Sequence, residues 1–569
     1  MRSSAMKSVE QRRQSLRERF PVWVPRTLDQ WLDVCAVEHG QRPLVITDEV
    51  TLTYADVARQ SRQLADALVA LGVRPGDRVG MVMANYPEFV PFKFAIARAG
   101  AIGIPFNFLY RREELGYVLE QSQCSVLLTM TGFAGLDYLG MLDEIAPGWE
   151  HRPRHPTLRA IAVLSTDGRE RAGAMTYADL LELGAAHPGL SGGIAHDPGD
   201  IGDMLYTSGS TGLPKGVLVT HDAVLRTGYA SALTRAYDDG RRILFSLPCY
   251  HMFGYVEGLL SATFVGGAVI PQTKFSAEGY LAGIERHKAD DILCVPTMAV
   301  AMVESAAREK YDLSSLTAIL CGSAPAPVWL WQQVEKLFGV GEIVTGYGMT
   351  ECGGAMTLTR PEDPIELTSH TVGRPKAAGA AGVPGTGDLV IYSTVDPVSG
   401  EPLPAGETGE LVSRGPTTMT GYWNKTDETA AVLGDDGILR SGDLGRVRAD
   451  GYLELTGRSK ELYKSGGELV MPREIEDLLA RHGAVSQVFA IGIVDDRWGE
   501  IGCAVIVRAP GSSITEDEVI TYCKQHLARF KVPKRVLFLD AAQLPTTPTG
   551  KVQKFRLAEM ASAVPNVLI

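Results

Sequence analysis

The sequence lacks clustered cysteines and an excess of positive charge. Its 8 cysteines are scattered through 569 residues, with no CxxC pair and no spacing typical of metal ligands. This pattern predicts reduced thiols, and we expect a cytoplasmic protein without a disulfide framework. The formal net charge is −12, which argues against nucleic acid as a partner, because neutralising phosphates requires a basic face.

A long uninterrupted hydrophobic run is also missing. The most apolar stretch, residues 243–271, is broken by Pro248, His251, Glu257 and several glycines, so it predicts a buried strand followed by a helix rather than a transmembrane segment. The first twenty residues carry several arginines but no apolar core of a secretory signal. We expect a solvated or packed helix there, and a helix that lies on a membrane surface is the alternative.

Helix-like and strand-like segments alternate along the first part of the chain. The predicted helices are 54–72, 86–100 and 114–121, and the predicted strands are 78–83, 101–107 and 124–130. This alternation predicts an α/β protein with layers and largely parallel sheets. Residues 150–200 lack the rhythm and are rich in His, Pro, Gly and Asp, so we expect a variable connector there.

Four later strand-like runs each end in a loop of small residues. They are "DMLY" before "TSGSTG", "ILFSLP" before "CYHMFG", "AILC" before "GSAPAP", and "EIVT" before "GYGMTE". Ligands of open α/β sheets bind beyond the carboxyl ends of the strands. The four loops therefore predict one shared crevice.

The pattern changes near the C-terminus. A predicted helix at 472–483 is followed by strands at 485–494 and 502–509 and by a second helix that begins with a capping box of Thr515 and Glu518. We expect Ile514 and Val519 to form the hydrophobic staple of that box. The sequence predicts two domains, 1–457 and 458–569, the second a small α+β module.

The stretch "YTSGSTGLPKGV" predicts a phosphate-binding loop. Glycines let backbone N–H groups turn towards an anion, and Lys215 adds a cation. The loop does not follow the Walker A spacing, because its Lys lies between Pro214 and Gly216 and a strand-like run follows. No G-x-S-x-G nucleophile elbow is present either. The other loop residues are Thr207, Ser208, Gly209, Ser210, Thr211 and Gly212.

This loop resembles the signature of the adenylate-forming superfamily, which includes acyl-CoA synthetases. Further blocks that resemble the family follow in order: "LPCYHMFG", "GYGMTE", "GELVSRGPTTMTGYW", "SGDLG", "DGYLELTGR" and "PTTPTGKVQK". The resemblance covers residues 52–556. It implies a large N-terminal domain of layered α/β subdomains with a β-barrel-like subdomain, and a small, mobile α+β C-terminal domain.

The resemblance also implies where ATP and Mg²⁺ bind. The loop from Thr207 to Lys215 would cover the triphosphate, Thr350 would touch the α-phosphate, and Glu351 would hold Mg²⁺. A single carboxylate suffices for Mg²⁺, which shares phosphate oxygens and keeps its waters. Residues implied to bind the adenine are Gly322, Ser323, Ala324 and a stacking Tyr347, and those implied at the ribose are Asp443 and Arg458.

The remaining implied roles belong to the C-terminal module. Lys551 would bridge the substrate carboxylate and the α-phosphate during adenylation. The module would then turn at a hinge, Lys460, and present Lys464, Gly466 and Gly467 to the pantetheine arm of CoA. This is a hinge-type domain motion that lets one active site serve two half-reactions.

The acid itself is constrained by the "CYHMFG" block. In the family an aromatic residue at the place of His251 gates the carboxylate site, and amino-acid-activating members have an Asp where this chain has Met252. The one acid of the longer stretch "HMFGYVEG", Glu257, lies a helical turn further on, which argues against an amino acid as the substrate. The expected pocket is apolar or small, which favours a hydrophobic acid: Phe253, Tyr255, Val256, Gly346, Met349, Cys352, Gly353 and Gly354.

The leading hypothesis is an AMP-forming acyl-CoA synthetase for a medium- or long-chain aliphatic, or alicyclic, acid. An aryl acid stays open. The alternatives are a ligase that loads a carrier protein or an amine, a luciferase-type oxygenase, and a non-catalytic ATP-binding scaffold. The substrates implied by the first hypothesis are the acid, ATP and CoA, and the sequence leaves a monomer or a homodimer open.

Overall fold

The computed structural model describes residues 7–207, 213–324, 326–458, 461, 463–465, 468–495, 499–546 and 552–563. The chain forms two compact units, Met1–Ile391 with Arg414–Leu439, and Tyr392–Ser413 with Arg440–Ile569. The second unit thus groups 392–413 and 440–457 with the C-terminal module. The sequence boundary at 457/458 stays a prediction.

The first unit contains a seven-stranded sheet that is parallel except at one edge. β1 pairs in parallel with β13 and antiparallel with β2, and the remaining pairs are parallel. β14 and β15 are buried along their whole length, as expected for strands covered on both faces. The order is β16 (Glu342–Val344), β15 (Ala318–Cys321), β14 (Asp291–Cys294), β12 (Arg242–Phe245), β13 (Ala268–Pro271), β1 (Pro43–Ile46) and β2 (Thr51–Thr53).

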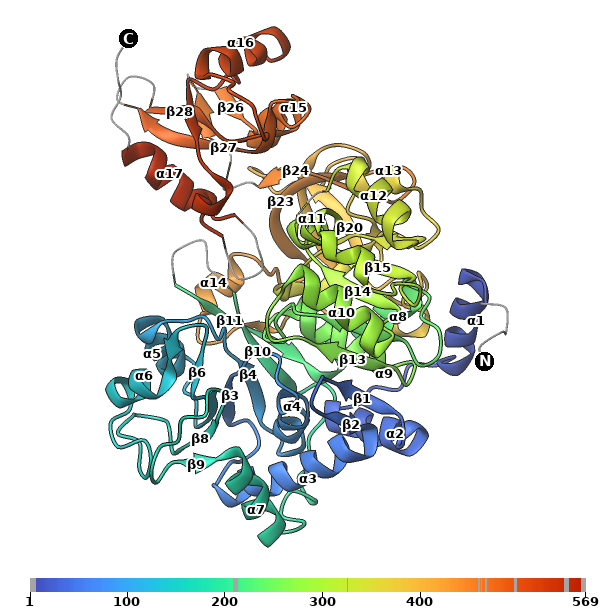
Figure 1. Ribbon diagram of the computed structural model, residues 1–569, viewed down its shortest axis with the longest axis vertical. Coiled ribbons are helices and arrows are strands. Elements are labelled where there is room, and N and C mark those ends of the chain that lie inside the picture. Colours follow the sequence, from blue (N-terminus) through green and yellow to red (C-terminus); the bar gives the residue numbers. More distant parts are fainter. Residues whose placement is uncertain are drawn as a thin grey trace. The chain divides into compact units, whose positions relative to one another are not determined.

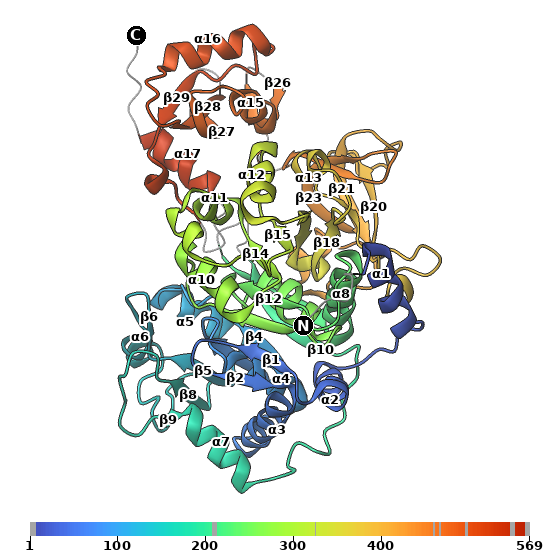
Figure 2. The same cartoon turned by 45° about the vertical axis from the view of Figure 1, so that its right-hand side comes forward.

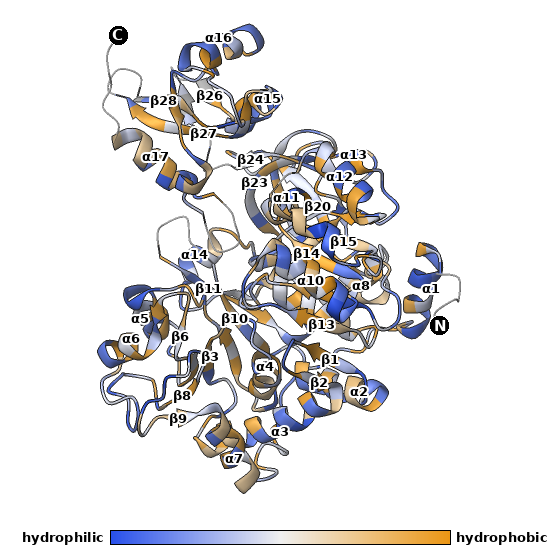
Figure 3. Ribbon diagram, in the orientation of Figure 1, coloured by the Kyte–Doolittle hydropathy of each residue, from blue (hydrophilic) through white to orange (hydrophobic). Residues whose placement is uncertain are grey.

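A second sheet in the same unit has eight strands. β4, β3, β5, β8 and β9 run parallel to one another, and β10, β11 and β22 form antiparallel pairs at one edge. Hydrophobic residues, orange in Figure 3, are frequent in its strands, and β5 is buried at every residue. The order is β22 (Gly421–Tyr422), β11 (Lys215–Thr220), β10 (Ile201–Thr207), β4 (Ile102–Pro105), β3 (Arg78–Val82), β5 (Val126–Met130), β8 (Ala160–Leu164) and β9 (Met175–Thr176).

Helices cover both sheets. α2, α3, α4 and α7 pack against one another beside the second sheet, and α10, α11 and α12 lie side by side over the first (Figures 1 and 2). The helices of this unit are α1 (Val9–Arg19), α2 (Leu28–His39), α3 (Tyr54–Ala70), α4 (Phe89–Arg98), α5 (Arg112–Gln121), α6 (Tyr138–Ile145), α7 (Tyr177–Ala186), α8 (His221–Thr234), α9 (Ser261–Thr263), α10 (Ala277–His287), α11 (Pro296–Glu304), α12 (Val328–Phe338), α13 (Ile365–His370) and α14 (Thr426–Ala430).

The predicted alternation of helices and strands is confirmed, and α3 shows why it is readable. Its N-cap Thr53 accepts a hydrogen bond from the Asp56 N–H, and its apolar residues Val57, Leu64 and Leu68 are fully buried. The prediction of an irregular connector over 150–200 is wrong in part. β8 extends the second sheet beside β5, and α7 packs on α3; both elements are short, so their patterns are lost among the turn residues.

Helix α1 is packed rather than solvated. Arg12 forms an ion pair with Glu342, and Arg13 donates to Glu362 Oε1 at 2.6 Å and to the Thr234 carbonyl at 2.9 Å. Both arginines are buried. Among the helices of the described residues, none has the length and hydrophobicity needed to cross a bilayer.

The second unit contains an antiparallel pair extended into a four-stranded sheet, followed by an α+β module. The sheet has the order β20 (Ile391–Val395), β21 (Gly409–Arg414), β23 (Leu439–Val447) and β24 (Leu453–Arg458). The module contains β25 (Tyr463–Ser465), β26 (Glu468–Val470), α15 (Pro472–Leu479), β27 (Val485–Asp495), β28 (Gly499–Arg508), α16 (Glu516–His526), β29 (Arg535–Phe538) and α17 (Lys554–Ala563).

The start of α16 confirms the capping box that the sequence predicts. The Thr515 side chain accepts from the Glu518 N–H, and Glu518 Oε2 accepts from the Thr515 N–H at 2.8 Å. Ile514 and Val519, the two staple residues, are buried in the same hydrophobic cluster.

Candidate functional site

The predicted phosphate-binding loop connects two antiparallel strands. β10 ends at Thr207 and β11 begins at Lys215, and these two residues are register partners across the pair. The loop therefore leads into a strand, unlike a Walker A loop, which precedes a helix. Residues 208–212, which include the predicted Ser208, Gly209, Ser210, Thr211 and Gly212, lie outside the described residues.

Tyr422 brings the ends of two distant motifs together. β22 pairs with β11, and the Lys215 ammonium lies 5.0 Å from the centre of the Tyr422 ring, which is cation–π range. The Tyr422 hydroxyl donates to Glu351 Oε1 at 2.8 Å. Burial raises the pKa of Tyr422, and the Glu351 carboxylate raises it further, so the phenol remains a donor. The sequence hypothesis quoted "MTGYW" but assigned Tyr422 no role; its place in a family block was the only signal.

The "GYGMTE" block forms a tight hairpin that positions Thr350 and Glu351. β17 (Gly346–Met349) pairs with β18 (Gly354–Leu358), which pairs in turn with β19 (Arg374–Pro375). A Cβ on Gly346 would lie 2.3 Å from the Thr357 carbonyl, and one on Gly348 would lie 2.0 Å from the Gly354 carbonyl. Only glycine permits this approach. It holds Tyr347 between the two glycines, just before Thr350.

The predicted adenine loop adjoins the "CYHMFG" block. Gly322, Ser323 and Ala324 follow β15, and Ser323 has a left-handed φ of 73°. A Cβ on Gly322 would lie 3.3 Å from the Phe253 ring. The backbone of this loop therefore borders the first residue predicted to line the acyl pocket, whereas Pro325 lies outside the described residues.

The helix predicted after β12 is a π-helix, η1 (Phe253–Leu260), which continues into α9. π-helical turns are rare and occur often at functional sites. His251 precedes η1, and its Nδ1 accepts from the Phe253 N–H at 3.2 Å. Tyr255 and Val256 are buried, so the two predicted pocket residues point into the unit and not towards solvent.

Tyr255 is held by a buried ion pair that sequence reasoning missed. Its hydroxyl donates to Asp203 Oδ2 at 3.0 Å, and Lys93 Nζ lies 2.8 Å from Asp203 Oδ1, in a geometry that is an ion pair rather than an aligned hydrogen bond. All three side chains are buried. Since Asp203 belongs to β10, the strand that enters the phosphate loop is fixed to η1.

Glu257 is also paired. Its Oε1 accepts from Lys376 Nζ at 2.5 Å, and its Oε2 accepts from Ser231 Oγ at 2.7 Å. The acid nearest to Met252 in this stretch is therefore neutralised by a lysine of the protein. This agrees with an acid substrate that has no amino group.

The small residues after Glu351 lie against α8 and η1. Cys352 and Gly353 are buried, and a Cβ on Gly354 would lie 3.4 Å from Thr227 Cγ2 and 3.7 Å from Met252 Cβ. The structure thus brings Gly354 beside Met252, and the same block places Gly346 and Met349 in the adjoining strand.

Asp443 and Arg458 belong to the second unit and are register partners of β23 and β24. Asp443 is buried, and its N–H donates to Ser441 Oγ at 3.0 Å. The side chains of Arg458 and Lys464 are not described, and Lys460, Gly466, Gly467 and Lys551 lie outside the described residues. The roles of all these residues stay predictions.

The described residues contain no group of three or more His, Cys, Asp or Glu side chains that could form a metal cluster. Glu351 nevertheless fits Mg²⁺, because Oε1 accepts from Tyr422 and no described residue donates to Oε2. One carboxylate together with phosphate oxygens and water is a usual environment for this ion.

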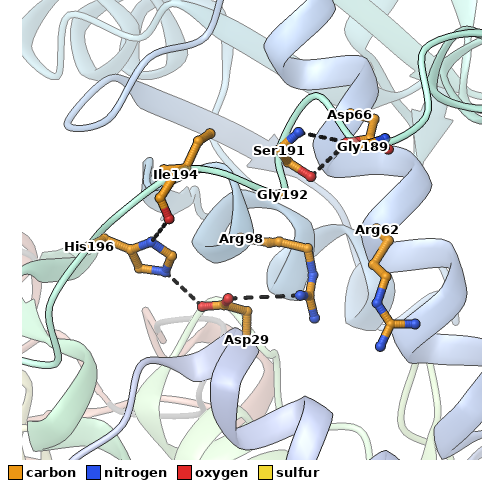
Figure 4. A pocket seen from close by; sticks show the side chains of 9 residues that line it. All are labelled: Asp29, Arg62, Asp66, Arg98, Gly189, Ser191, Gly192, Ile194 and His196. Carbon is orange, nitrogen blue, oxygen red and sulfur yellow. Dashed lines mark hydrogen bonds and ion pairs between the residues drawn. The ribbon is translucent and has the colours of Figure 1, made fainter.

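A hollow of about 290 Å³ lies elsewhere in the first unit, between α2, α3, α4 and the segment 189–196 (Figure 4). Asp66 accepts from the Gly189 and Ser191 N–H groups, and His196 Nε2 lies 2.8 Å from Asp29 Oδ1. These contacts fix the segment onto the helices. No residue of the family blocks lines this hollow, so we do not assign the substrate to it.

Residues 32–423 match the family described as AMP-binding enzyme, and residues 474–551 match the AMP-binding enzyme C-terminal domain. A Mycobacterium tuberculosis 3-[(3aS,4S,7aS)-7a-methyl-1,5-dioxo-octahydro-1H-inden-4-yl]propanoyl:CoA ligase is 34% identical over 536 residues, covering 94% of this chain and 99% of the relative. A feruloyl-CoA synthase of Amycolatopsis is 35% identical over 525 residues, covering 91% and 94%.

The fold agrees with that of solved relatives. The crystal structure of the anthranilate CoA ligase AuaEII in complex with anthranoyl-AMP has a TM-score of 0.80 at 26% identity, covering 95% of this chain and 98% of that one. Sequence blocks, site geometry and whole-chain similarity point the same way, and the chain belongs to the AMP-binding enzymes of the adenylate-forming superfamily.

Proposed function

We propose that this chain is an ATP-dependent, AMP-forming acyl-CoA synthetase for a hydrophobic carboxylic acid. It joins the carboxylate to the α-phosphate of ATP with release of pyrophosphate, and then transfers the acyl group to the CoA thiol with release of AMP. The observation that supports this most strongly is the convergence of Lys215 and Glu351 on Tyr422.

This convergence suits adenylation because two anions must approach each other. Lys215 supplies positive charge beside the triphosphate loop, and such preorganised charge stabilises the transition state. Glu351 would hold Mg²⁺, which when bound neutralises phosphate charge, and Tyr422 orients the Glu351 carboxylate. Lys551 would supply the second cation, at the α-phosphate, when the C-terminal module is turned for the first half-reaction.

The acyl site accounts for a hydrophobic substrate. Phe253, Tyr255, Val256 and Met349 supply apolar surface, and Glu257 is already paired with Lys376. An amino acid would find no unpaired carboxylate in this block for its ammonium group. The relatives named for an oxo-substituted bicyclic propanoyl group and for feruloyl support an alicyclic or aryl acid as well as an aliphatic one.

CoA is the acceptor that the relatives' names support. Transfer to a carrier protein or an amine shares the ATP chemistry and remains the second candidate. In the CoA reaction, the module would turn near Lys460 and bring Lys464, Gly466 and Gly467 to the pantetheine arm. We also propose a cytoplasmic location.

The test is a panel of aliphatic, alicyclic and aryl acids incubated with ATP and Mg²⁺, with and without CoA. We expect acid-dependent pyrophosphate release without CoA, and stoichiometric AMP and acyl thioester only with CoA. Acyl-AMP that persists in the presence of CoA would instead indicate a ligase whose acceptor is a carrier protein or an amine. No pyrophosphate from any acid would overturn the synthetase assignment.

A further inference from the structure

Three buried polar side chains from separate parts of the first unit meet behind the small residues of the predicted acyl pocket. Ser231 comes from α8, Glu257 from η1, and Lys376 from the segment after β19. Lys376 Nζ donates to Glu257 Oε1 at 2.5 Å and to Ser231 Oγ at 2.6 Å. The Lys376 side chain is 0% exposed and that of Glu257 is 2% exposed.

A contribution to folding stability does not by itself explain why Lys376 and Glu257 are buried. Withdrawing two charges from water is unfavourable, and replacing a buried pair with apolar side chains of similar volume is often neutral or stabilising. Burial lowers the pKa of Lys376, and Glu257 opposes this effect. The ammonium has three N–H donors, and the contacts given within the described residues provide acceptors for two of them.

The position of Gly354 connects the group to the acyl site. A Cβ at Gly354 would lie 3.9 Å from Glu257 Oε1, the oxygen that accepts from Lys376. It would also lie 3.4 Å from Thr227 and 3.7 Å from Met252, all ordinary contact distances. The backbone at Gly354 therefore lies within one side-chain contact of Glu257 Oε1, the oxygen that Lys376 holds.

We propose that Lys376, Glu257 and Ser231 form a polar end wall of the acyl site that selects a hydrophobic acid with an oxygen substituent, a carbonyl or a hydroxyl, remote from its carboxylate. This inference rests on the proposed function. The remaining Lys376 N–H is the donor for that oxygen, and Gly354 leaves the space through which the substituent reaches it.

The consequence is a measurable preference between acids of equal shape. A site built to hydrogen-bond a substrate oxygen discriminates against the analogue that lacks it, because the protein group is then left unpaired. We expect kcat/KM for adenylation to favour the oxygen-bearing acid by at least ~10-fold. A purely apolar pocket would favour the alkyl analogue.

The experiment measures acid-dependent pyrophosphate release by the full-length protein with matched pairs of acids. One pair is para-acetylbenzoate and para-isopropylbenzoate; the other is a straight-chain series in which each alkanoate is compared with the oxo acid carrying its ketone on the penultimate carbon. The variants are Ser231→Ala and the double variant Lys376→Met with Glu257→Met. Ser61→Ala is the control, because Ser61 is also a buried helical serine, whose hydroxyl donates to the Ala58 carbonyl of its own helix.

Ser231 accepts from Lys376 and thereby fixes the direction of its remaining N–H. Support consists of a preference for the oxygen-bearing member that falls in Ser231→Ala, where this hold on the ammonium is lost, approaches unity in the double variant, and is retained in Ser61→Ala. If the double variant does not fold, the proposal is tested by the kcat/KM ratio of each acid pair in wild type and in Ser231→Ala. Activation of several acids with the alkyl member preferred in every pair, or with a preference that Ser231→Ala leaves unchanged, overturns the end wall and leaves the synthetase assignment standing. Failure to activate any acid overturns both.

Discussion

The Tyr422 hydroxyl donates a hydrogen bond of 2.8 Å to Glu351 Oε1. The two residues are 71 positions apart in the sequence, and the bond joins the "MTGYW" block to the "GYGMTE" block. Because Lys215 lies over the ring of the same tyrosine, one side chain orients both the expected Mg²⁺ ligand and the cation of the phosphate loop.

Replacing Tyr422 with phenylalanine tests this arrangement. The variant keeps the ring beneath Lys215 and loses the hydrogen bond to Glu351. A hydrogen bond to a charged group contributes about 1.5–3 kcal/mol, so we expect adenylation to slow about 10- to 100-fold, with a raised Mg²⁺ requirement. Tyr229→Phe is the control, because the buried Tyr229 hydroxyl has no hydrogen-bond partner among the described residues. Equal rates in the two variants would contradict the role of Tyr422.

The tight β17–β18 hairpin predicts a strong effect of Gly348→Ala. The added Cβ would lie 2.0 Å from the Gly354 carbonyl, so the strands must separate and move Tyr347 and Thr350. We expect a loss of acid-dependent pyrophosphate release of more than ~100-fold, since misplacing catalytic groups by about 1 Å is already this damaging. Gly341→Ala, where a Cβ would meet nothing within 4 Å, should retain activity. A fully active Gly348→Ala protein would disprove this interpretation of the hairpin.

The buried Asp203 predicts a change in stability. Asp203→Asn leaves the Lys93 ammonium buried without its counterion, and breaking a buried pair in this way costs about 3–5 kcal/mol of unfolding free energy. The exposed pair of Asp239 and Arg42 provides the control, because Asp239→Asn should cost no more than about 1 kcal/mol. Urea unfolding measures both. Similar losses in the two variants would mean that the Lys93–Asp203 pair is effectively hydrated.

The contact between His196 and Asp29 predicts a pH dependence of stability. The hydrogen bond to Asp29 raises the pKa of His196 above its ordinary 6.5. Burial alone would raise the pKa of Asp29, but hydrogen bonds from His196 and Thr27 lower it below its ordinary 3.8. The nearby His221 stays neutral, because burial lowers its pKa to about 3. Arg98 Nη1 lies 3.9 Å from Asp29 Oδ2.

The raised pKa of His196 and the lowered pKa of Asp29 determine how stability changes with pH. The contribution of His196 is fully present below its ordinary pKa and is lost as the pH rises through the raised value, whereas that of Asp29 is lost only in acid, as the pH falls through the lowered value. We therefore expect wild type to exceed His196→Gln in unfolding free energy by more at about pH 5.5 than at about pH 9. Urea titrations at the two pH values measure the difference. A difference that does not change between them would rule out a charged pair.

The role proposed for Lys551 predicts that its replacement affects the two half-reactions differently. Lys551→Ala should cripple the formation of acyl-AMP, yet form thioester from supplied acyl-AMP and CoA at a near wild-type rate, since the bridging cation is needed only while the carboxylate meets the α-phosphate. Single-turnover assays of each step measure this. Equal losses in both steps would contradict the proposal that the C-terminal module turns between the two half-reactions.

The features that could be predicted from the sequence are those determined by local patterns of residues. The capping box of Thr515 and Glu518 involves residues three apart, and the apolar faces of helices such as α3 repeat every few residues. The phosphate-binding role of the loop that ends at Lys215 stays a prediction, and it rests on a contiguous run of glycines, hydroxyl residues and one lysine. Each of these features is determined within one turn, one helix or one strand pair.

The partners of the site could not be predicted because they are distant in sequence. Glu257 and Lys376 are 119 positions apart, and Tyr255 and Asp203 are 52 apart. A buried charge shows no periodicity that identifies its counterion. The π-helical form of η1 was also unpredictable, since the stretch has only the pattern of an apolar helix, and its residues Tyr255 and Glu257 contact partners from other elements.

The most direct test of the account is the exchange of labelled pyrophosphate into ATP in the absence of CoA. Reversible acyl-AMP formation predicts exchange that requires a hydrophobic acid and Mg²⁺, and that falls by orders of magnitude in Glu351→Gln. Exchange that proceeds without any acid, or no exchange with any acid of the panel, would contradict the claim that this chain activates a carboxylate on the α-phosphate of ATP.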